Sequence, residues 1–523
     1  ASLNQQTSTM RASVSVRPET PFATTLQSGM QTGGQQMLAL NRDLFAAERN
    51  VQAALSTNPL ILATGLDHYL AHYPYGCTEQ LVSQSFPLIA MTDQPWFIDD
   101  AKRISERVKF TIQQLGMRQT STGGFNYWPE VGIPVNNQFA SVYAMHFLTE
   151  ARAAQYDVPS DVFSSGISYL RDLSNQPVTD LDTARLHAYA IYVLTRNELV
   201  TTNYVTHLQA DLDQQPKIAW KDDITSAYIA ATYRLLNSNA DAEKLIGLYK
   251  PNQTAVTGPF YDGAIGDAEY LYLIAKHFPE RLKRVDDSLI QSLVDKLNDD
   301  SISTVLSAYT TIGLAAWGDA NKASADAGLS IQGKDQAGKT LDLTAADPLF
   351  QIADVAPNIK QVLFSSTNKT RYFYQIIQAG FDKKGPPAAA KQGIEVVREY
   401  HDADDQPLTT VHVGDDIIVH VRVRSTDTLY HDNIAIVDLL PGGFDIARDS
   451  VNKSSMDYAD IREDRAIFFG TIDPQMKEMI YNSDYYSYNS SRYWYNIRDN
   501  KIVDINKSNN NKSTTENVIY NCS

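Results

Sequence analysis

The sequence predicts a multidomain protein in which a helical domain interrupts a small β-domain and a β-sandwich follows. The length of 523 residues exceeds what one hydrophobic core usually organises and predicts about three domains. A long block of repeated helical patterns lies between short strand-like segments. A later segment alternates apolar and polar residues, which is typical of a strand with one face on a core.

Composition and charge exclude two classes of protein. Hydrophobic residues make up 43% of the chain, yet no run of about 18 apolar residues exists to span a membrane. The net charge of −16 argues against nucleic-acid binding, which requires a basic surface. The only cysteines, Cys77 and Cys522, lie in such different contexts that we expect no structural disulfide between them. Residues 1–11 carry no signal peptide, so we expect the chain to be cut from a longer protein.

Residues 1–37 are predicted to form a linker and the first strand of the β-domain. Val14 and Val16 alternate with polar residues until Pro18 ends the pattern. One strand is not stable by itself, so its partners must come from elsewhere in the chain. We expect them in residues 329–390, the remainder of the β-domain. The strands predicted there are 341–343, 362–364 and 371–377.

Residues 38–328 carry the helical pattern. Asn58 and Pro59 read as a helix cap followed by a first-turn proline, and apolar residues then recur on one helical face. Similar stretches recur at 140–154, 183–196, 224–236, 268–278 and 301–317. Successive helix pairs without strand signals predict a helical solenoid, or a solenoid closed into an α/α toroid.

Residues 391–480 are predicted to form a partial C-terminal β-sandwich. Val419, Val421 and Val423 alternate with basic side chains, as in a strand with one buried face. Residues 481–523 shift abruptly to Asn, Ser, Tyr and Lys. Such a segment cannot bury enough apolar surface to offset its ordering entropy. We therefore predict a disordered tail of foreign or frame-shifted origin.

The most informative segment is the eight-residue run YPYGCTEQ at 73–80. A tight turn leading into a helix can bring the Cys77 thiol against the Gln80 side-chain amide, and Gly76 supplies backbone freedom for that turn. If the sulfur displaces ammonia from the amide, the product is an internal thioester, a single-use covalent trap. Residues 81–90 look helical, which places the thiol where the helix dipole stabilises a thiolate.

The same run resembles the thioester signature of the alpha-2-macroglobulin and complement family, in the form of its bacterial members. The resemblance implies a C-terminal fragment with an α/α-toroid thioester domain inserted in a CUB-like β-domain, followed by a macroglobulin-type sandwich. It also implies a broad-spectrum endopeptidase inhibitor and not an enzyme. Such inhibitors are cleaved in a bait region, which we expect to lie outside this chain, and bind the protease when a lysine amine opens the thioester.

Two tyrosines flank the predicted bond. Tyr73 and Tyr75 are close enough in sequence to lay a ring over it and exclude water, and we favour Tyr73 because Pro74 restricts its backbone. The alternative is that both rings only pack the connection between helices. Glu79 is expected to face solvent or to cap the turn, without a catalytic duty.

The resemblance also indicates a loop that selects the nucleophile. Relatives that prefer hydroxyl targets carry a histidine in a loop before a helix, and the comparable positions here are Asn136 and Asn137. With no imidazole there to form an acyl intermediate, we expect direct attack by lysine amines. His146 lies on an apolar helix face and is interpreted as a packed core histidine.

We expect no cofactor and no metal site. His68 and His72 have the spacing of a two-histidine zinc motif, but the glutamate of that motif is absent. The resemblance implies endopeptidases as covalent targets, a penicillin-binding protein as a further partner, and a monomer. It also implies the periplasmic side of the bacterial inner membrane, reached through an N-terminal lipid anchor outside this chain.

A second class of function stays open at this stage. The protein could be an α/α-toroid hydrolase or a cysteine acyltransferase with Cys77 as a nucleophile that turns over. Turnover requires a general base oriented toward the thiol. His72 is the nearest histidine in sequence, five positions away across a proline.

Overall fold

A computed structural model gives the fold of the chain, and its described residues divide into two compact units. The helical unit comprises Ala23–Arg42 and Ala46–Gly380, and the sandwich unit comprises Asp43–Phe45 and Phe381–Cys522 together with Ala1–Phe22. The residues outside the description are 1, 4–5, 8–17, 19, 92–100, 130–136, 253–256, 259, 299–301, 321–327, 346, 386–392, 413, 428, 442–443, 454–455, 486–492, 497–500, 505–517 and 522–523.

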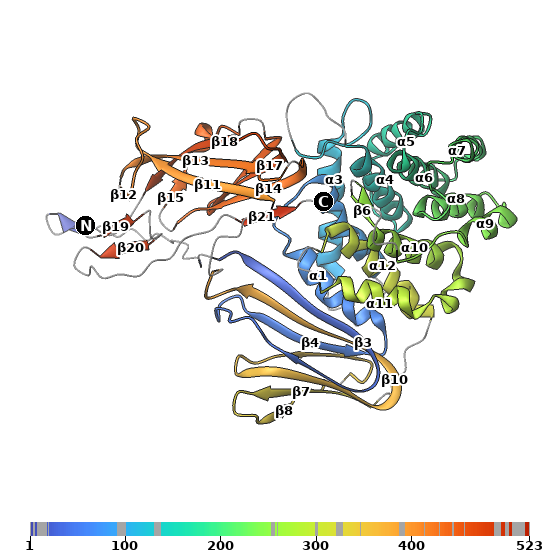
Figure 1. Ribbon diagram of the computed structural model, residues 1–523, viewed down its shortest axis with the longest axis horizontal. Helices are drawn as coiled ribbons and strands as arrows, with labels where there is room; N and C mark the ends of the chain where they lie inside the picture. The colour runs from blue at the N-terminus through green and yellow to red at the C-terminus, as the bar shows by residue number, and fades with distance from the viewer. Residues whose placement is uncertain are drawn as a thin grey trace. The chain divides into compact units, whose positions relative to one another are not determined.

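Helices make up most of the helical unit (Figure 1). The α-helices are α1 (Ala63–Ala71), α2 (Thr78–Met91), α3 (Ala101–Arg118), α4 (Gln138–Ala153), α5 (Ser160–Ser174), α6 (Leu181–Arg196), α7 (Thr202–Gln214), α8 (Ile224–Leu235), α9 (Asn239–Ile246), α10 (Gly263–His277), α11 (Asp287–Lys296) and α12 (Thr304–Ala320). Two 3₁₀ helices, η1 (Pro59–Leu62) and η2 (Pro279–Arg284), and a hairpin of β5 (Thr257–Gly258) and β6 (Tyr261–Asp262) accompany them.

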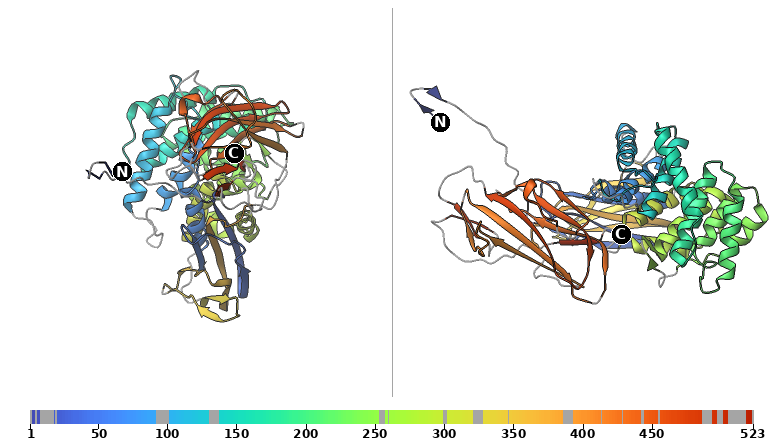
Figure 2. Two further views of the ribbon diagram at one scale, coloured as in Figure 1. Left: turned by 90° about the vertical axis from the view of Figure 1, so that its left-hand side faces the viewer. Right: turned by 90° about the horizontal axis from the view of Figure 1, so that it is seen from above.

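The even-numbered helices contact one another in a closed order, α2–α4–α6–α8–α10–α12 and back to α2. We call them the ring helices. Each is buried along most of its length, as expected for helices that are apolar nearly all round. The odd-numbered helices α3, α5, α7, α9 and α11 pack on them and keep exposed polar faces, and several pairs run side by side in Figures 1 and 2.

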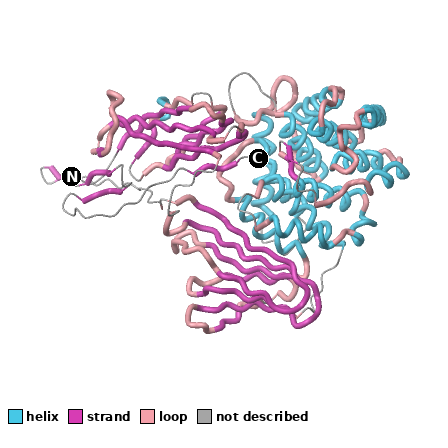
Figure 3. The backbone as a smooth tube through the Cα atoms, in the orientation of Figure 1, coloured by secondary structure: helices cyan, strands magenta, loops and turns pink. Residues whose placement is uncertain are grey.

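One antiparallel sheet adjoins the helices (Figure 3). Its order is β8-β7-β10-β4-β9, with β3 also paired to β10. The strands are β3 (Phe22–Ala39), β4 (Asn50–Ser56), β7 (Leu329–Asp335), β8 (Thr340–Asp342), β9 (Phe350–Asp354) and β10 (Ile359–Phe381). Strands that precede the helices in sequence therefore share a sheet with strands that follow them.

The structure shifts several predicted boundaries. The strand predicted at Val14 and Val16 lies outside the described residues, and β3 and β4 supply the early strands instead. The helical block was predicted to begin at residue 38, but its first helical turn begins at Pro59. β4 escaped detection because Ala53, Ala54 and Leu55 are all buried, so the strand shows no polar alternation.

Two predicted strands, 362–364 and 371–377, are parts of one long strand, β10. Its first half pairs with β7, where Phe364 lies opposite Ile331. Its second half pairs with β4, where Tyr374 lies opposite Leu55. β10 thus connects the two ends of the helical segment.

The sandwich unit contains two four-stranded sheets, ordered β11-β13-β18-β15 and β16-β17-β14-β21, and a small sheet β12-β19-β20. Val419, Val421 and Val423 face a common core, as predicted. The strands are β11 (Ile394–His401), β12 (Thr410–Val411), β13 (Asp416–Ser425), β14 (His431–Leu439), β15 (Phe444–Ile446), β16 (Tyr458–Ile461), β17 (Arg465–Ile472), β18 (Lys477–Tyr485), β19 (Tyr493–Asn496), β20 (Lys501–Asp504) and β21 (Val518–Asn521); a 3₁₀ turn, η3 (Arg448–Ser450), and a short N-terminal hairpin of β1 (Ser2–Leu3) and β2 (Gln6–Thr7) complete the unit.

The predicted tail boundary at residue 481 falls inside β18. Tyr481 is buried in the sandwich core and its hydroxyl donates to Asp438 Oδ2 over 2.7 Å. Much of the rest of 481–523 lies outside the described residues. Among the helices that the structure describes, none is long and apolar enough to cross a membrane.

Candidate functional site: the Cys77–Gln80 turn

Cys77 occupies the position directly before α2. Its carbonyl accepts the first helical hydrogen bond, from Leu81 N, over 3.0 Å. Cys77 and Gln80 have no exposed surface. The expected placement of the thiol at a helix N-terminus therefore holds in the structure.

The turn brings the two side chains together. The Cys77 N–H donates to Gln80 Oε1 over 3.0 Å, and the Gln80 N–H points to Cys77 Sγ over 3.4 Å. Gln80 Nε2 is buried without a hydrogen-bond partner among the described residues. A buried amide nitrogen without a partner is costly, so the burial of the Gln80 amide calls for an explanation.

Three residues, Arg118, Asn126 and Tyr127, hold the turn in place through hydrogen bonds. We call them the strap. Arg118, at the end of α3, donates from Nη2 to the Gly76 carbonyl over 2.8 Å and from Nη1 to Thr78 Oγ1 over 3.2 Å. The Thr78 N–H donates to the Tyr127 carbonyl over 2.8 Å, and its hydroxyl donates to the Asn126 carbonyl over 2.5 Å. The backbone on both sides of Cys77 is thus fixed to another part of the helical unit.

Glu79 does not face solvent, which corrects the expectation from sequence. It is completely buried because α2 is covered on all sides along this stretch. Its Oε1 accepts from Ser83 Oγ over 2.6 Å and from Thr304 Oγ1 over 2.8 Å, while Oε2 has no partner among the described residues. Burial raises the pKa of Glu79 to about 7, and the two hydroxyls offset only part of that effect.

The two candidate shielding residues differ in burial. Tyr75 is buried at 3% exposure, whereas Tyr73 is half-buried. Their rings meet edge to face with centroids 5.5 Å apart, and Tyr73 packs in the same way on Tyr69. The ring pair ties the segment before Cys77 to α1. The shielding role itself stays a prediction.

Of the two predicted selectivity residues, Asn136 lies outside the described residues. Asn137 caps α4, because its side chain accepts from Ala140 N over 2.9 Å. It also lines a cavity of about 400 Å³ at the N-terminal ends of α4, α6 and α8. Asn137 therefore has a structural role as a helix cap. It also lies beside a cavity that the sequence alone does not predict.

The cavity has aromatic walls and one buried carboxyl group. Phe260 and Tyr261 line it, and Phe260 packs 5.8 Å from the ring of Tyr127, the residue whose carbonyl holds Thr78. Burial, with a smaller effect from nearby Asp223, raises the pKa of Glu269 to about 8. The cavity is thus linked to the Cys77 turn only through the contacts from Phe260 to Tyr127 and from Tyr127 to Thr78.

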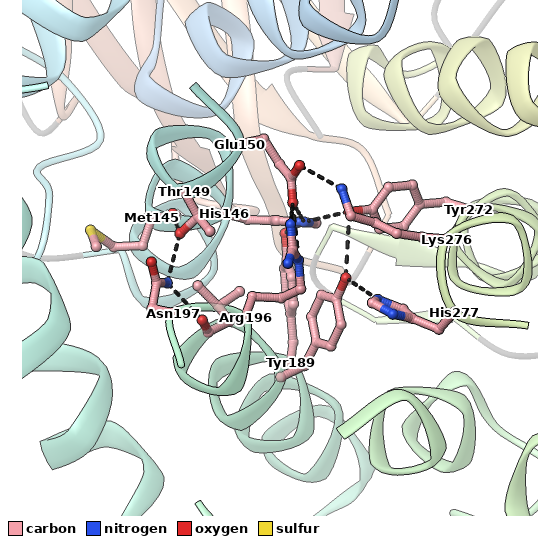
Figure 4. Close-up of polar contacts among 12 residues, drawn as sticks. Met145, His146, Thr149, Glu150, Tyr189, Arg196, Asn197, Tyr272, Lys276 and His277 are labelled. Atoms are coloured by element: carbon pink, nitrogen blue, oxygen red, sulfur yellow. Dashed lines mark hydrogen bonds and ion pairs between the residues drawn. The ribbon is translucent and has the colours of Figure 1, made fainter. Parts of the chain in front are cut away.

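His146 lies far from the turn, in a second polar cluster (Figure 4). It has no exposed surface, and its ring nitrogens lie 2.8 Å from the Tyr189 hydroxyl and 2.9 Å from the Tyr272 hydroxyl. Burial lowers its pKa to about 3. Its ring contacts Phe86, which lies roughly 13 Å beyond Cys77 along α2. His146 is a packed core histidine, as interpreted from the sequence.

Glu150 is the centre of this second cluster. Arg196 Nη2 lies 2.8 Å from its Oε1, and Lys276 Nζ lies 2.5 Å from its Oε2. Burial alone would raise the pKa of Glu150, but Lys276, His146 and Arg196 outweigh it and lower the pKa to about 2. We call these residues the Glu150 cluster.

Comparison with known proteins decides the family. Residues 393–501 match the family model described as the bacterial alpha-2-macroglobulin MG10 domain. An alpha-2-macroglobulin of Rickettsia conorii is 34% identical over 90% of this chain, and an alpha-2-macroglobulin homolog of Yersinia pestis is 32% identical over 92%. The chain belongs to the bacterial alpha-2-macroglobulin family. The family predicted from YPYGCTEQ is thereby confirmed.

Solved structures of alpha-2-macroglobulins share the fold. The crystal structure of the native Escherichia coli protein from domain MG7 to the C-terminus matches with a TM-score of 0.72 at 18% identity, covering 90% of this chain and 78% of that one. Salmonella alpha-2-macroglobulin reacted with methylamine matches with a TM-score of 0.71 at 17% identity, over 90% of this chain and 32% of that one. The macroglobulin-family fold, with a helical region and a β-sandwich, is thus established. The chain spans about a quarter of the length of the curated relatives, 25% and 26%.

Proposed function

We propose that the Cys77–Gln80 turn closes into a thioester and that the protein containing this chain uses it to trap endopeptidases covalently. The observation that supports this most is the state of the Gln80 amide. Its oxygen is held by the Cys77 N–H, and its nitrogen is buried without a partner among the described residues. Closure would expel that nitrogen as ammonia and so remove the unsatisfied group.

The chemistry balances with groups already in the turn. The Cys77 sulfur attacks Gln80 Cδ, the C–N bond breaks, and the thiol proton leaves with the amide nitrogen as ammonia. The hydrogen bond from Cys77 N–H to Oε1 polarises the carbonyl for that attack. In the trapping step a lysine amine attacks the same carbon, the C–S bond breaks, and the thiolate leaves at the N-terminus of α2, where the helix dipole stabilises it.

The surroundings of the turn suit an amine nucleophile. The cavity linked to it through Phe260 and Tyr127 has aromatic walls, which suit the alkyl chain of a lysine. Asn136 and Asn137 are proposed to occupy the loop where hydroxyl-selective relatives carry a histidine, and the lack of an imidazole there would favour direct aminolysis. Tyr73 and Tyr75 are proposed to exclude water until activation.

The wider context belongs to this proposal. The closed ring of helices between strands of one sheet is proposed to be an α/α toroid inserted in a CUB-like domain. The whole protein is proposed to act as a monomeric lipoprotein on the periplasmic side of the inner membrane, with a penicillin-binding protein as partner. The support is membership of the family, whose curated members carry the name alpha-2-macroglobulin.

Intact-mass measurement with and without methylamine tests the proposal. We expect the chain to be lighter than calculated by one ammonia, and methylamine to add as an amide at Gln80 with one new thiol at Cys77. Cys77→Ala should abolish both changes. Cys522→Ala is the matched control, because it removes the other cysteine of the chain.

An unshifted mass with no methylamine uptake would contradict the proposal. Release of product over many cycles would favour the hydrolase or acyltransferase instead. The structure provides no support for that alternative, because the His72 ring stacks on His68 and its Nδ1 lies 2.8 Å from the His68 carbonyl of its own helix.

A further inference from the structure

A polar patch covers the outer face of the sheet formed by β11, β13 and β18 in the sandwich unit. His401 lies opposite Ile418 on β13, and His420 is two residues further along that strand. Residues two apart on a strand share a face, so the two histidines are diagonal neighbours. Glu478 on β18 lies opposite Arg422 and belongs to the same face. The opposite face carries the buried valines of the core.

The two imidazoles converge on one carboxylate oxygen. Asp405 Oδ1 lies 2.8 Å from His401 Nδ1 and 3.0 Å from His420 Nε2. The rings are 4.3 Å apart between centroids. Both histidines are buried, at 8% and 6% exposure, although they stand on the outer face of the sheet.

The backbone of a short hairpin aims Asp405 at the histidines. Asp405 has φ of +60°, in the left-handed region that aspartate tolerates better than most residues. The Asp402 carboxylate fixes the hairpin by accepting from the N–H groups of Asp404 and Gln406 over 3.0 and 2.8 Å. The carboxylate is therefore placed by the loop and remains open to solvent on its other side, with a side-chain exposure of 65%.

A second layer of charged residues orients His420. Glu478 Oε1 lies 2.9 Å from His420 Nδ1, the nitrogen that faces away from Asp405. Arg422 holds Glu478 through its Nε over 2.8 Å and pairs with Glu399 through Nη1. A carboxylate on the outer nitrogen of a histidine is the support that metal-binding histidines usually have.

We propose that His401 Nδ1, His420 Nε2 and an Asp405 carboxylate oxygen bind a zinc ion, with water at the fourth position. These three atoms lie within 4.8 Å of one another, and they form the one such group among the described residues. Zinc prefers nitrogen and carboxylate ligands at about 2.0–2.2 Å in a tetrahedron, which sets ligand separations of roughly 3.3 Å. The Asp405 oxygen, now 2.8 and 3.0 Å from the two nitrogens, would move outward by a few tenths of an ångström, and the two nitrogens, which lie within 4.8 Å of each other, would settle about 3.3 Å apart. Zinc then replaces the protons shared between Asp405 and the two imidazoles.

The other histidine and carboxylate pairs of the sandwich unit lack this convergence. His412 pairs with Asp415 over 3.3 Å, and His431 pairs with Asp427 over 3.1 Å. Each pair offers one imidazole and one carboxylate. The expectation from sequence of no metal site considered only the helical spacing of His68 and His72, whereas this cluster is assembled by strand register.

Zinc titration of the full chain by calorimetry tests the proposal, in a Cys77→Ala, Cys522→Ala background so that no thiol competes. We expect one equivalent of zinc to bind with release of protons. Asp405→Asn and His420→Gln should each abolish measurable binding. Glu478→Gln should weaken it roughly 10- to 100-fold, because it removes the support and not a ligand. His412→Gln is the matched control and should bind as the parent does.

The melting temperature gives a second readout. Zinc should raise the Tm of the parent and of His412→Gln, and should leave that of Asp405→Asn unchanged. Because the Asp405 side chain is exposed, that variant should fold. Absence of zinc binding in the parent, or equal binding in Asp405→Asn, overturns the proposal. Equal loss in Glu478→Gln and His412→Gln also overturns the site as assigned.

Discussion

Two buried polar clusters among the ring helices are built in opposite ways. At the start of α2, Glu79 and Gln80 each keep a buried atom without a hydrogen-bond partner among the described residues. In the second half of α4, Glu150 has one oxygen on Arg196 and the other on Lys276. The difference teaches that burial of polar groups alone does not indicate function here. The unsatisfied cluster adjoins the turn for which we propose a reaction, whereas the satisfied one joins α4, α6 and α10 through ion pairs.

Removing the Glu150 carboxylate should have the largest effect. Glu150→Ala leaves Arg196 and Lys276 partly buried without their counter-charge, which should lower the free energy of unfolding by about 3–5 kcal/mol. At pH 5, where Glu79 is neutral in the folded chain, Glu79→Gln should lower it by about 1 kcal/mol or less, because no cation depends on Glu79. Urea unfolding of both variants measures the contrast, and equal losses would refute it.

The pH dependence of stability should have opposite sign for the two carboxyl groups. The pKa of Glu79 is raised from 4.5 to about 7, so the unfolded chain loses this proton first and stability falls as pH rises from about 4.5 to 7. The pKa of Glu150 is lowered to about 2, so its contribution is present above pH 4.5 and is lost as pH falls toward 2. The contribution of each carboxyl group to the free energy of unfolding changes by about 3 kcal/mol, at 1.36 kcal/mol per pKa unit.

Unfolding free energies at pH 5 and pH 8 check the Glu79 half of this prediction. The parent should lose about 2–3 kcal/mol more stability between these values than Glu79→Gln does, since other buried carboxyl groups such as Glu269 contribute equally to both. Measurements below pH 4 check the prediction for Glu150. There the unfolding free energy of Glu150→Gln should fall less steeply with decreasing pH than that of the parent. A parent slope that Glu79→Gln leaves unchanged would show that another group titrates.

Loss of the strap on the turn should have an intermediate effect. Arg118→Ala removes the donors to Gly76 and Thr78, which should cost about 2 kcal/mol. The same change should reduce the fraction of chains that take up methylamine, because the turn is no longer held. Arg118→Lys should restore little, since an ammonium cannot reproduce the planar fork. Full methylamine uptake in Arg118→Ala would show that the turn forms without the strap.

The smallest effect is expected at a helix cap. Asn137→Ala should lower stability by about 1 kcal/mol through loss of the bond to Ala140 N. Asp180→Ala, which removes the capping box of α6, is a matched control with a similar loss. If only Asn137→Ala also changes the preference for amine over hydroxyl nucleophiles, the residue has the selectivity role predicted from sequence.

Much of the fold was predictable because local patterns carry it. Helix pairs and the valine alternation of β13 reflect periods of 3.6 and 2 residues that burial imposes. β4 was not predictable, because a strand buried on both faces shows no alternation of apolar and polar residues. That β10 is one continuous strand was not predictable either, because its partner β4 lies hundreds of residues away in the sequence. The part of β18 that falls within the predicted tail was also missed, because Tyr481 carries a polar hydroxyl and is nevertheless buried.

The proximity of Cys77 and Gln80 was predictable because the two residues are neighbours in sequence. Their supports were not, since Arg118 and Thr304 reach the turn from other helices. Glu79 was misjudged because a helix surrounded on all sides gives no polar face to read. The histidine cluster of β11 and β13 was missed because strand register, not sequence spacing, brings its members together.

The long strand β10 also sets the order in which the chain can mature during synthesis. β4 ends at Ser56, opposite Phe373, so this pairing cannot form until the ribosome has made all the helices in between. At about 5–20 residues per second, the apolar β4 segment stays without its partner for roughly 15–60 s. The nascent chain therefore exposes the unpaired apolar segment of β4 while the helices fold. A chaperone that binds extended apolar peptides would bind this segment most readily during that interval.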